Sequence, residues 1–176
     1  ASSTESASSA STETASTASA APAPAEPAAP QGPVFRTKMM GMEMTSPLVT
    51  KTLTAEGVQG MTIQAPENAQ VEIQRGDNII VDAGVNYSIA IRTGAFNAAS
   101  TKNLYNILDE EGTLVTDEEN LVIYRRSGEN GSFLFGMGVT VGENQYQCST
   151  VATGFAFTRD QVDQMVEACR TLSAPN

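Results

Sequence analysis

Two cysteines, Cys148 and Cys169, are the only thiols of this chain. An even number of cysteines favours a disulfide bond in a protein that leaves the reducing cytosol. Closing a loop of about 20 residues would stabilise the fold by roughly 3 kcal/mol in the chain-entropy model. Two buried free thiols are the alternative, whereas a redox-catalytic thiol is usually exposed and set in a CxxC motif, which the chain lacks. We predict a structural disulfide between Cys148 and Cys169.

The chain contains no histidine, which removes several kinds of catalysis. Hydrolases with a histidine base, zinc sites of the HExxH type and histidine proton shuttles are excluded. Acidic runs at residues 109–111 and 117–119 supply carboxylates that could act in pairs on a glycoside. Both runs border predicted turns, where a solvated acidic surface is the usual outcome. We predict no catalytic, metal-binding or cofactor-binding residues and a protein that is not an enzyme. A carboxylate-based hydrolase acting on envelope carbohydrate is the alternative.

Four methionines lie close together, at Met39, Met40, Met42 and Met44. Thioether sulfur is a soft ligand, so this cluster has the chemistry to bind copper(I). Methionine is also a common filler of irregular gaps in protein cores, and metal sites rich in methionine usually include histidine. Met42 and Met44 alternate with polar residues, as in a half-buried strand. We therefore predict a core or edge-strand role for these methionines.

The start of the chain differs in composition from the rest. Residues 1–33 are almost entirely Ala, Ser, Thr, Pro and Glu, with no aliphatic residue larger than alanine. Such a segment cannot bury enough apolar surface to offset the entropy lost on ordering it. We predict that residues 1–33 form a disordered tether. Residues 34–56 are predicted to form a methionine-containing lead-in strand or extended segment, and residues 57–173 an α+β domain of ordinary size.

The charge balance of the chain limits its partners. Ten Lys and Arg residues against 20 Asp and Glu residues give a net charge of −10. An acidic protein repels phosphate backbones and anionic membrane surfaces, so nucleic acid is not an expected partner. No apolar run approaches the roughly 20 residues that cross a bilayer as a helix. We therefore predict that the folded part is not inserted into a membrane.

The sequence begins at Ala1 without an initiator methionine. A start rich in Ala, Ser and Thr is typical of a mature chain whose secretory signal has been removed. A lipidated cysteine immediately before Ala1 would fit equally well, and a low-complexity linker of a larger protein ranks second. We predict an exported protein, periplasmic or at the cell surface, with a lipid anchor on a residue preceding Ala1 as one form of attachment.

Short strands make up most of the folded part. Apolar and polar residues alternate in four short segments between residues 61 and 91, and each segment is followed by a turn signal. Strands joined by tight turns pair antiparallel, since parallel neighbours need long crossovers. In a later strand at 133–141, Gly136 and Gly138 share one face, which indicates that another element packs closely against the backbone there. The other later strands are predicted at residues 114–115, 121–124 and 146–148.

Two helices interrupt or follow the strands. The i, i+3, i+4 spacing of Leu104, Ile107 and Leu108 predicts a helix, with Asn97 or Ser100 as its N-cap. A second helix is predicted at the C-terminus, where Thr158 and Gln161 form a capping box. The residues on its apolar face are Val162, Met165, Val166, Cys169 and Leu172. Together with the strands, these helices predict a mainly antiparallel sheet flanked by two helices.

This order of elements resembles the Mog1/PsbP-like domain over residues 57–172. That family is known from photosystem accessory proteins and small bacterial lipoproteins, and the resemblance implies a protein that assists or binds rather than catalyses. The metal-associated histidines of the photosystem members have no counterpart here. The segments that carry the resemblance are residues 58–66 (VQGMTIQAP), 86–91 (NYSIAI), 146–148 (YQC), 157–162 (FTRDQV) and 169–172 (CRTL).

The sequence therefore favours a non-enzymatic binding or accessory module, exported and tethered at the bacterial cell envelope. Its expected partner is another envelope protein, met through an exposed apolar patch. The candidate residues of that patch are Met39, Met40, Phe155 and Phe157. A purely structural surface component is a further alternative.

Overall fold

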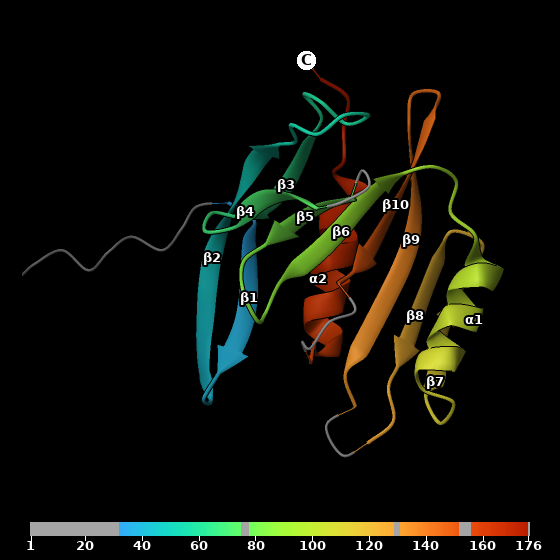
Figure 1. Ribbon diagram of the computed structural model, residues 1–176. Coiled ribbons are helices and arrows are strands. Elements are labelled where there is room, and N and C mark those ends of the chain that lie inside the picture. The colour runs from blue at the N-terminus through green and yellow to red at the C-terminus, as the bar shows by residue number, and fades with distance from the viewer. Residues whose placement is uncertain (1–31, 75–77, 129–130, 152–155, 176) are drawn as a thin grey trace, which may run out of the picture.

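The computed structural model describes residues 32–74, 78–128, 131–151 and 156–175. These residues form two antiparallel sheets and two helices, which confirms the predicted α+β fold (Figure 1). The predicted tether of residues 1–33 lies outside the described residues, apart from Gly32 and Pro33.

The larger sheet has seven strands in the described part of the chain, and all neighbours in it are antiparallel. Pairing of β6 with β10 joins the strands that precede helix α1 to those that follow it. In spatial order the strands are β4 (Gln70–Gln74), β5 (Asn78–Asp82), β6 (Ser88–Thr93), β10 (Asn144–Thr150), β9 (Phe133–Val141), β8 (Leu121–Arg125) and β7 (Thr113–Asp117).

The smaller sheet consists of β1 (Val34–Met39), β2 (Met42–Thr52) and β3 (Thr62–Pro66), with β2 in the middle. The sequence predicts β3 in one meander with β4, β5 and β6. That prediction is confirmed for the last three strands and wrong for β3, which pairs with β2. A tight turn follows β3, in which the Ala69 amide donates to the Pro66 carbonyl (2.8 Å), and this turn directs the chain into the other sheet.

Helix α2 (Arg159–Arg170) packs between the two sheets, against β9 and β10 on one side and β1 and β3 on the other (Figure 1). The predicted capping box is present, because Thr158 accepts from the Gln161 amide and the Gln161 side chain accepts from the Thr158 amide. All five residues of the predicted apolar face are buried, which confirms the amphipathic helix. They meet a core of strand residues that includes Ile79, Ile89, Ile91, Ile123, Phe135 and Cys148.

Helix α1 (Ala98–Leu108) lies at the β7–β8 end of the larger sheet (Figure 1). Asn97 caps it by accepting from the Ser100 amide (2.8 Å). The residues whose spacing predicts the helix, Leu104, Ile107 and Leu108, are exposed. The buried residue of the helix is Tyr105 instead, in a second, smaller core with Val122, Tyr124 and Leu134.

Gly136 and Gly138 on β9 lie beneath the first turn of α1 and the segment that leads into it. A Cβ atom on Gly136 would lie 2.9 Å from Thr101 Cγ2, and one on Gly138 would lie 2.8 Å from Phe96 Cβ. Real Cβ atoms are not found at such distances. The close approach expected from the two glycines is therefore confirmed, and it allows α1 to cover this end of the sheet.

We expect Gly138→Ala to lower the free energy of unfolding by about 1–3 kcal/mol, because the added methyl group overlaps Phe96 Cβ, which cannot rotate away. Urea denaturation measures this change. Thr140→Ala, an exposed site on the same strand, is the control and should change stability by about 0.5 kcal/mol or less. Equal stability of the two variants would contradict the close packing.

Candidate functional site

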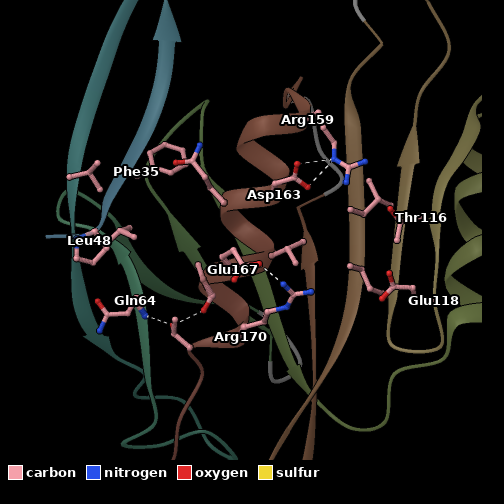
Figure 2. Close-up of a pocket in the computed structure, with 17 residues that line it drawn as sticks. Phe35, Leu48, Gln64, Thr116, Glu118, Arg159, Asp163, Glu167 and Arg170 are labelled. Atoms are coloured by element: carbon pink, nitrogen blue, oxygen red, sulfur yellow. Dashed lines mark hydrogen bonds and ion pairs between the residues drawn. The ribbon is translucent and has the colours of Figure 1, made fainter.

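An open groove of about 600 Å³ runs along the exposed side of α2 (Figure 2). One wall is the smaller sheet, with Phe35 and Leu48, and the other is the β7–β8 end of the larger sheet, with Thr116 and Ile123. The helix contributes Val166, among other residues. We call this feature the α2 groove.

The wall formed by β1 is held against α2 by side-chain amides. The Arg36 amide donates to Gln164 Oε1 (2.7 Å), and Gln164 Nε2 donates back to the Arg36 carbonyl (2.8 Å). Gln161, which is buried, donates to Thr37 Oγ1 (2.8 Å) and to Asn86 Oδ1 (3.1 Å). The Gln164 contacts satisfy backbone groups on the open edge of β1, and the Gln161 contacts tie two further side chains to the helix. The wall of the groove is therefore fixed by the protein's own hydrogen bonds.

The floor of the groove is apolar and continuous with the core. Phe35, Leu121, Ile123 and Val166 line the groove but are at most a few per cent exposed, so only parts of each side chain face its lumen. Phe35 is fixed by an edge-to-face contact with Tyr87, with ring centroids 5.2 Å apart. A rigid apolar floor suits the insertion of an apolar side chain from a ligand.

Charged side chains form the rim. Arg159 Nε lies 2.8 Å from Asp163 Oδ1, and Arg170 forms an ion pair with Glu167 one turn further along the helix (Figure 2). These exposed pairs contribute little to stability, but they present charges of both signs along one side of the groove. Glu118 lies on the facing wall.

The two carboxylates that α2 contributes to the groove are not arranged as the catalytic pair of a glycosidase. Asp163 and Glu167 follow one another on the same face of α2, and each is bound to an arginine. A glycosidase places its two carboxylates on either side of the scissile bond. The acidic runs singled out by sequence lie elsewhere, except for Glu118. Among them, Asp109 accepts from the Ser127 amide and hydroxyl (2.6 and 2.7 Å). These hydrogen bonds lower the pKa of its carboxyl and give it a structural role.

Cys148 on β10 and Cys169 on α2 are both fully buried and are free thiols in this structure. Burial raises the pKa of the Cys169 thiol well above its usual value, and a hydrogen bond with Cys148 and the charge of Cys148 raise it further. The same two sulfurs contribute to the raised pKa of the Tyr87 hydroxyl, after burial. The thiols therefore lie together inside the core, where they are poor nucleophiles. The disulfide between them stays a prediction.

Of the predicted apolar patch, the structure describes only the side chains of Met40 and Phe157. Met40 is exposed, the side chain of Met39 is not described, and Phe155 lies outside the described residues. Phe157 is 1% exposed, so its placement in a surface patch is wrong. Its carbonyl accepts from the Phe133 amide (2.9 Å), and it directly precedes the N-cap of α2. At this position an apolar residue packs against the first turn of the helix, and the capping box in the sequence was the signal for it.

Of the predicted core or edge-strand role of the methionine cluster, the core half is wrong for the described side chains. The edge half fits Met42 and Met44, because the part of β2 that carries them pairs with β1 alone. Met40, Met42 and Met44 are all exposed, on the hairpin of β1 and β2. Phe35 is the residue of this hairpin that belongs to the core, and the hairpin extends beyond the core. The methionines therefore have no core gap to fill.

Sequence reasoning did not find the residues that build the groove. Gln164 and Thr116 carry no motif, and their roles depend on β1 and β7 reaching α2 from opposite directions. Gln161 was found only as a capping residue. In the described ranges, no three Cys, Asp or Glu side chains are grouped so as to hold a metal ion. Likewise, neither described helix has the length and apolar character to cross a membrane.

Comparison with protein-family models, with curated proteins and with solved structures found no match to this chain. The resemblance to Mog1/PsbP-like domains therefore stays a prediction that depends on the residues quoted for it.

Proposed function

We propose that this protein is a non-enzymatic binding module of the bacterial cell envelope, which binds another envelope protein through the α2 groove. Residues 1–33 act as the tether that lets the folded part reach its partner. The observation that carries the proposal is the preformed apolar groove with a charged rim beside α2.

The composition of the groove supports a protein ligand. Protein interfaces combine a buried apolar centre with a polar rim. Here Leu48 and Val166 belong to the centre, and the two arginine–carboxylate pairs belong to the rim. Because the rim carries both signs of charge, it suits a polypeptide segment better than a polyanion, which the net charge of −10 also disfavours.

The alternative of a hydrolase has weaker support. Two carboxylates on the helix wall already have arginine partners, and a role in proton transfer would require each to leave its ion pair. A purely structural surface component would have no use for a groove whose wall is fixed by paired amide hydrogen bonds. The binding module accounts for both observations.

Thr116→Trp tests the proposal. Thr116 is half-buried and lines the groove, so an indole there fills the groove without removing a core side chain. We expect the full-length variant, immobilised and exposed to envelope extract of the source cells, to capture its partner at least about tenfold less well, since loss of one interface hot spot has that effect.

Thr113→Trp is the matched control, because Thr113 lies on the same strand but is exposed and does not line the groove. It should capture the same protein as the unsubstituted chain. Equal capture by both tryptophan variants would rule out the groove as the binding site, and the absence of any captured protein would contradict the proposed function.

A further inference from the structure

The hairpin of β1 and β2 carries methionine side chains that extend into solvent. Met40 is 94% exposed, Met42 67% and Met44 49%. Methionine is among the residues most often buried in folded proteins. Three such side chains exposed within five residues are not explained by packing, because the core does not reach this end of the hairpin.

The strand register places Met42 and Met44 on one face of the hairpin. Met42 pairs with Met39 and Met44 pairs with Thr37, whereas Glu43 pairs with Lys38 between them. Since side chains alternate along a strand, Met42 and Met44 share a face and the Lys38–Glu43 pair has the opposite one. Their Cα atoms are about 7 Å apart at the usual rise of a strand. Flexible side chains with three rotatable bonds can bring two sulfurs at that spacing to one point.

Met40 occupies a position that its side chain does not favour. It forms the two-residue turn with Gly41, and both have positive φ (52° and 79°). Turns of this kind usually have Asn, Asp or Gly at the first position, since a larger side chain is strained there. Residues held in such conformations cluster at functional sites, so this strain motivates a functional hypothesis. Met40 lies at the tip of the hairpin, two residues before Met42 in the chain.

The hairpin also holds the accessible soft ligands of the described chain. Cys148 and Cys169 are fully buried, and the remaining methionines, Met61, Met137 and Met165, are at most 3% exposed. The chain has no histidine. A soft metal ion in solution therefore meets thioethers on the hairpin and no competing soft donor elsewhere on the described surface.

We propose that Met40, Met42 and Met44 bind one monovalent soft metal ion, Cu(I) in the cell and Ag(I) as its redox-stable analogue. Neutral thioethers are ligands of choice for Cu(I) and poor ligands for hard ions such as Mg²⁺ and Ca²⁺. Thioethers carry no proton that the metal must displace. The affinity of this site is therefore the same at about pH 5 and about pH 7, unlike that of thiolate or imidazole sites. The site lies outside the α2 groove and is independent of the proposed protein binding.

The test is a titration of the full-length protein, with ¹³C-labelled methionine methyl groups, by silver nitrate. We expect the methyl resonances of Met40, Met42 and Met44 to shift until one equivalent has been added, with those of Met61 and Met165 unchanged. Met42→Leu/Met44→Leu keeps the size of the exposed side chains but removes two sulfurs. It should bind Ag(I) at least about tenfold more weakly, because loss of even an outer-shell partner has that effect on metal sites.

Met61→Leu is the matched control and should bind Ag(I) like the unsubstituted protein. Circular dichroism establishes that all variants are folded. Equal affinity of the double variant and the unsubstituted chain would overturn the proposal. So would a first shift at Met137, which lies opposite Cys148 in the sheet and would report metal at the buried thiols. Absence of Ag(I) binding, or an affinity that falls between pH 7 and pH 5, would overturn it as well.

Discussion

Replacing Phe157 by alanine is expected to lower the free energy of unfolding by about 3–5 kcal/mol, the usual range for a phenylalanine removed from a core. Phe157 is buried, and it lies at the junction between the start of β9 and the start of α2. Phe157 belongs to the same buried core as Val162, in the first turn of the helix, so the truncation leaves a cavity in that core. Urea denaturation measures the change.

Ile107→Ala is the control for this experiment. Ile107 is 70% exposed on α1, and its truncation should change stability by about 0.5 kcal/mol or less. Comparison of the two variants distinguishes the buried position of Phe157 in the structure from the exposed position that the sequence predicts. A Phe157→Ala variant that remained as stable as the control, yet lost partner binding, would contradict the burial of Phe157 and support its predicted place in a surface patch.

The second large effect concerns the cysteines. We expect the protein, if it is exported as proposed, to contain a Cys148–Cys169 disulfide, and the reduction of this bond to lower the free energy of unfolding by about 3 kcal/mol. Both thiols are buried in the same core, within hydrogen-bonding reach of each other. Intact mass under non-reducing conditions, lower by two hydrogen atoms than after reduction, detects the bond. Urea denaturation with and without reductant measures its effect.

Burial of the thiols also affects how fast the disulfide bond forms. Because the pKa of Cys169 is raised, little thiolate exists in the folded, reduced protein. Oxidation of the native protein should therefore be slow, and oxidation during refolding should be fast. Two thiols in protein purified from its native compartment, or equal stability of the oxidised and reduced forms, would contradict the predicted disulfide.

The parts of the fold that follow from local sequence signals could be predicted. Thr158 and Gln161 define the start of α2 by themselves, and the apolar spacing behind them defines its buried face. The glycines of β9 indicated a close approach although its partner, Phe96, could not be named. For α2 the signal and the structure lie within a few residues of each other, whereas the glycines indicated only that some distant segment would pack there.

Features that depend on distant segments could not be predicted. Strand β3 could pair with the edge of β2 or with the edge of β4. No residue of β3 indicates which of the two pairings forms. The spacing of Leu104, Ile107 and Leu108 predicts a helix, but the adjacent glycines of β9 favour packing through Tyr105. The α2 groove is formed by three separate parts of the chain, so none of its residues belongs to a sequence motif.

The central claim is that a protein partner occupies the α2 groove. A photo-crosslinking residue in place of Glu167, on the groove rim, tests it in the cells that make the protein, with Ile73 on the exposed strand β4 as the control position. We predict one discrete crosslinked species from position 167, absent from position 73 and lost in the presence of Thr116→Trp. No crosslinked species at position 167, or the same species at both positions, would contradict the claim.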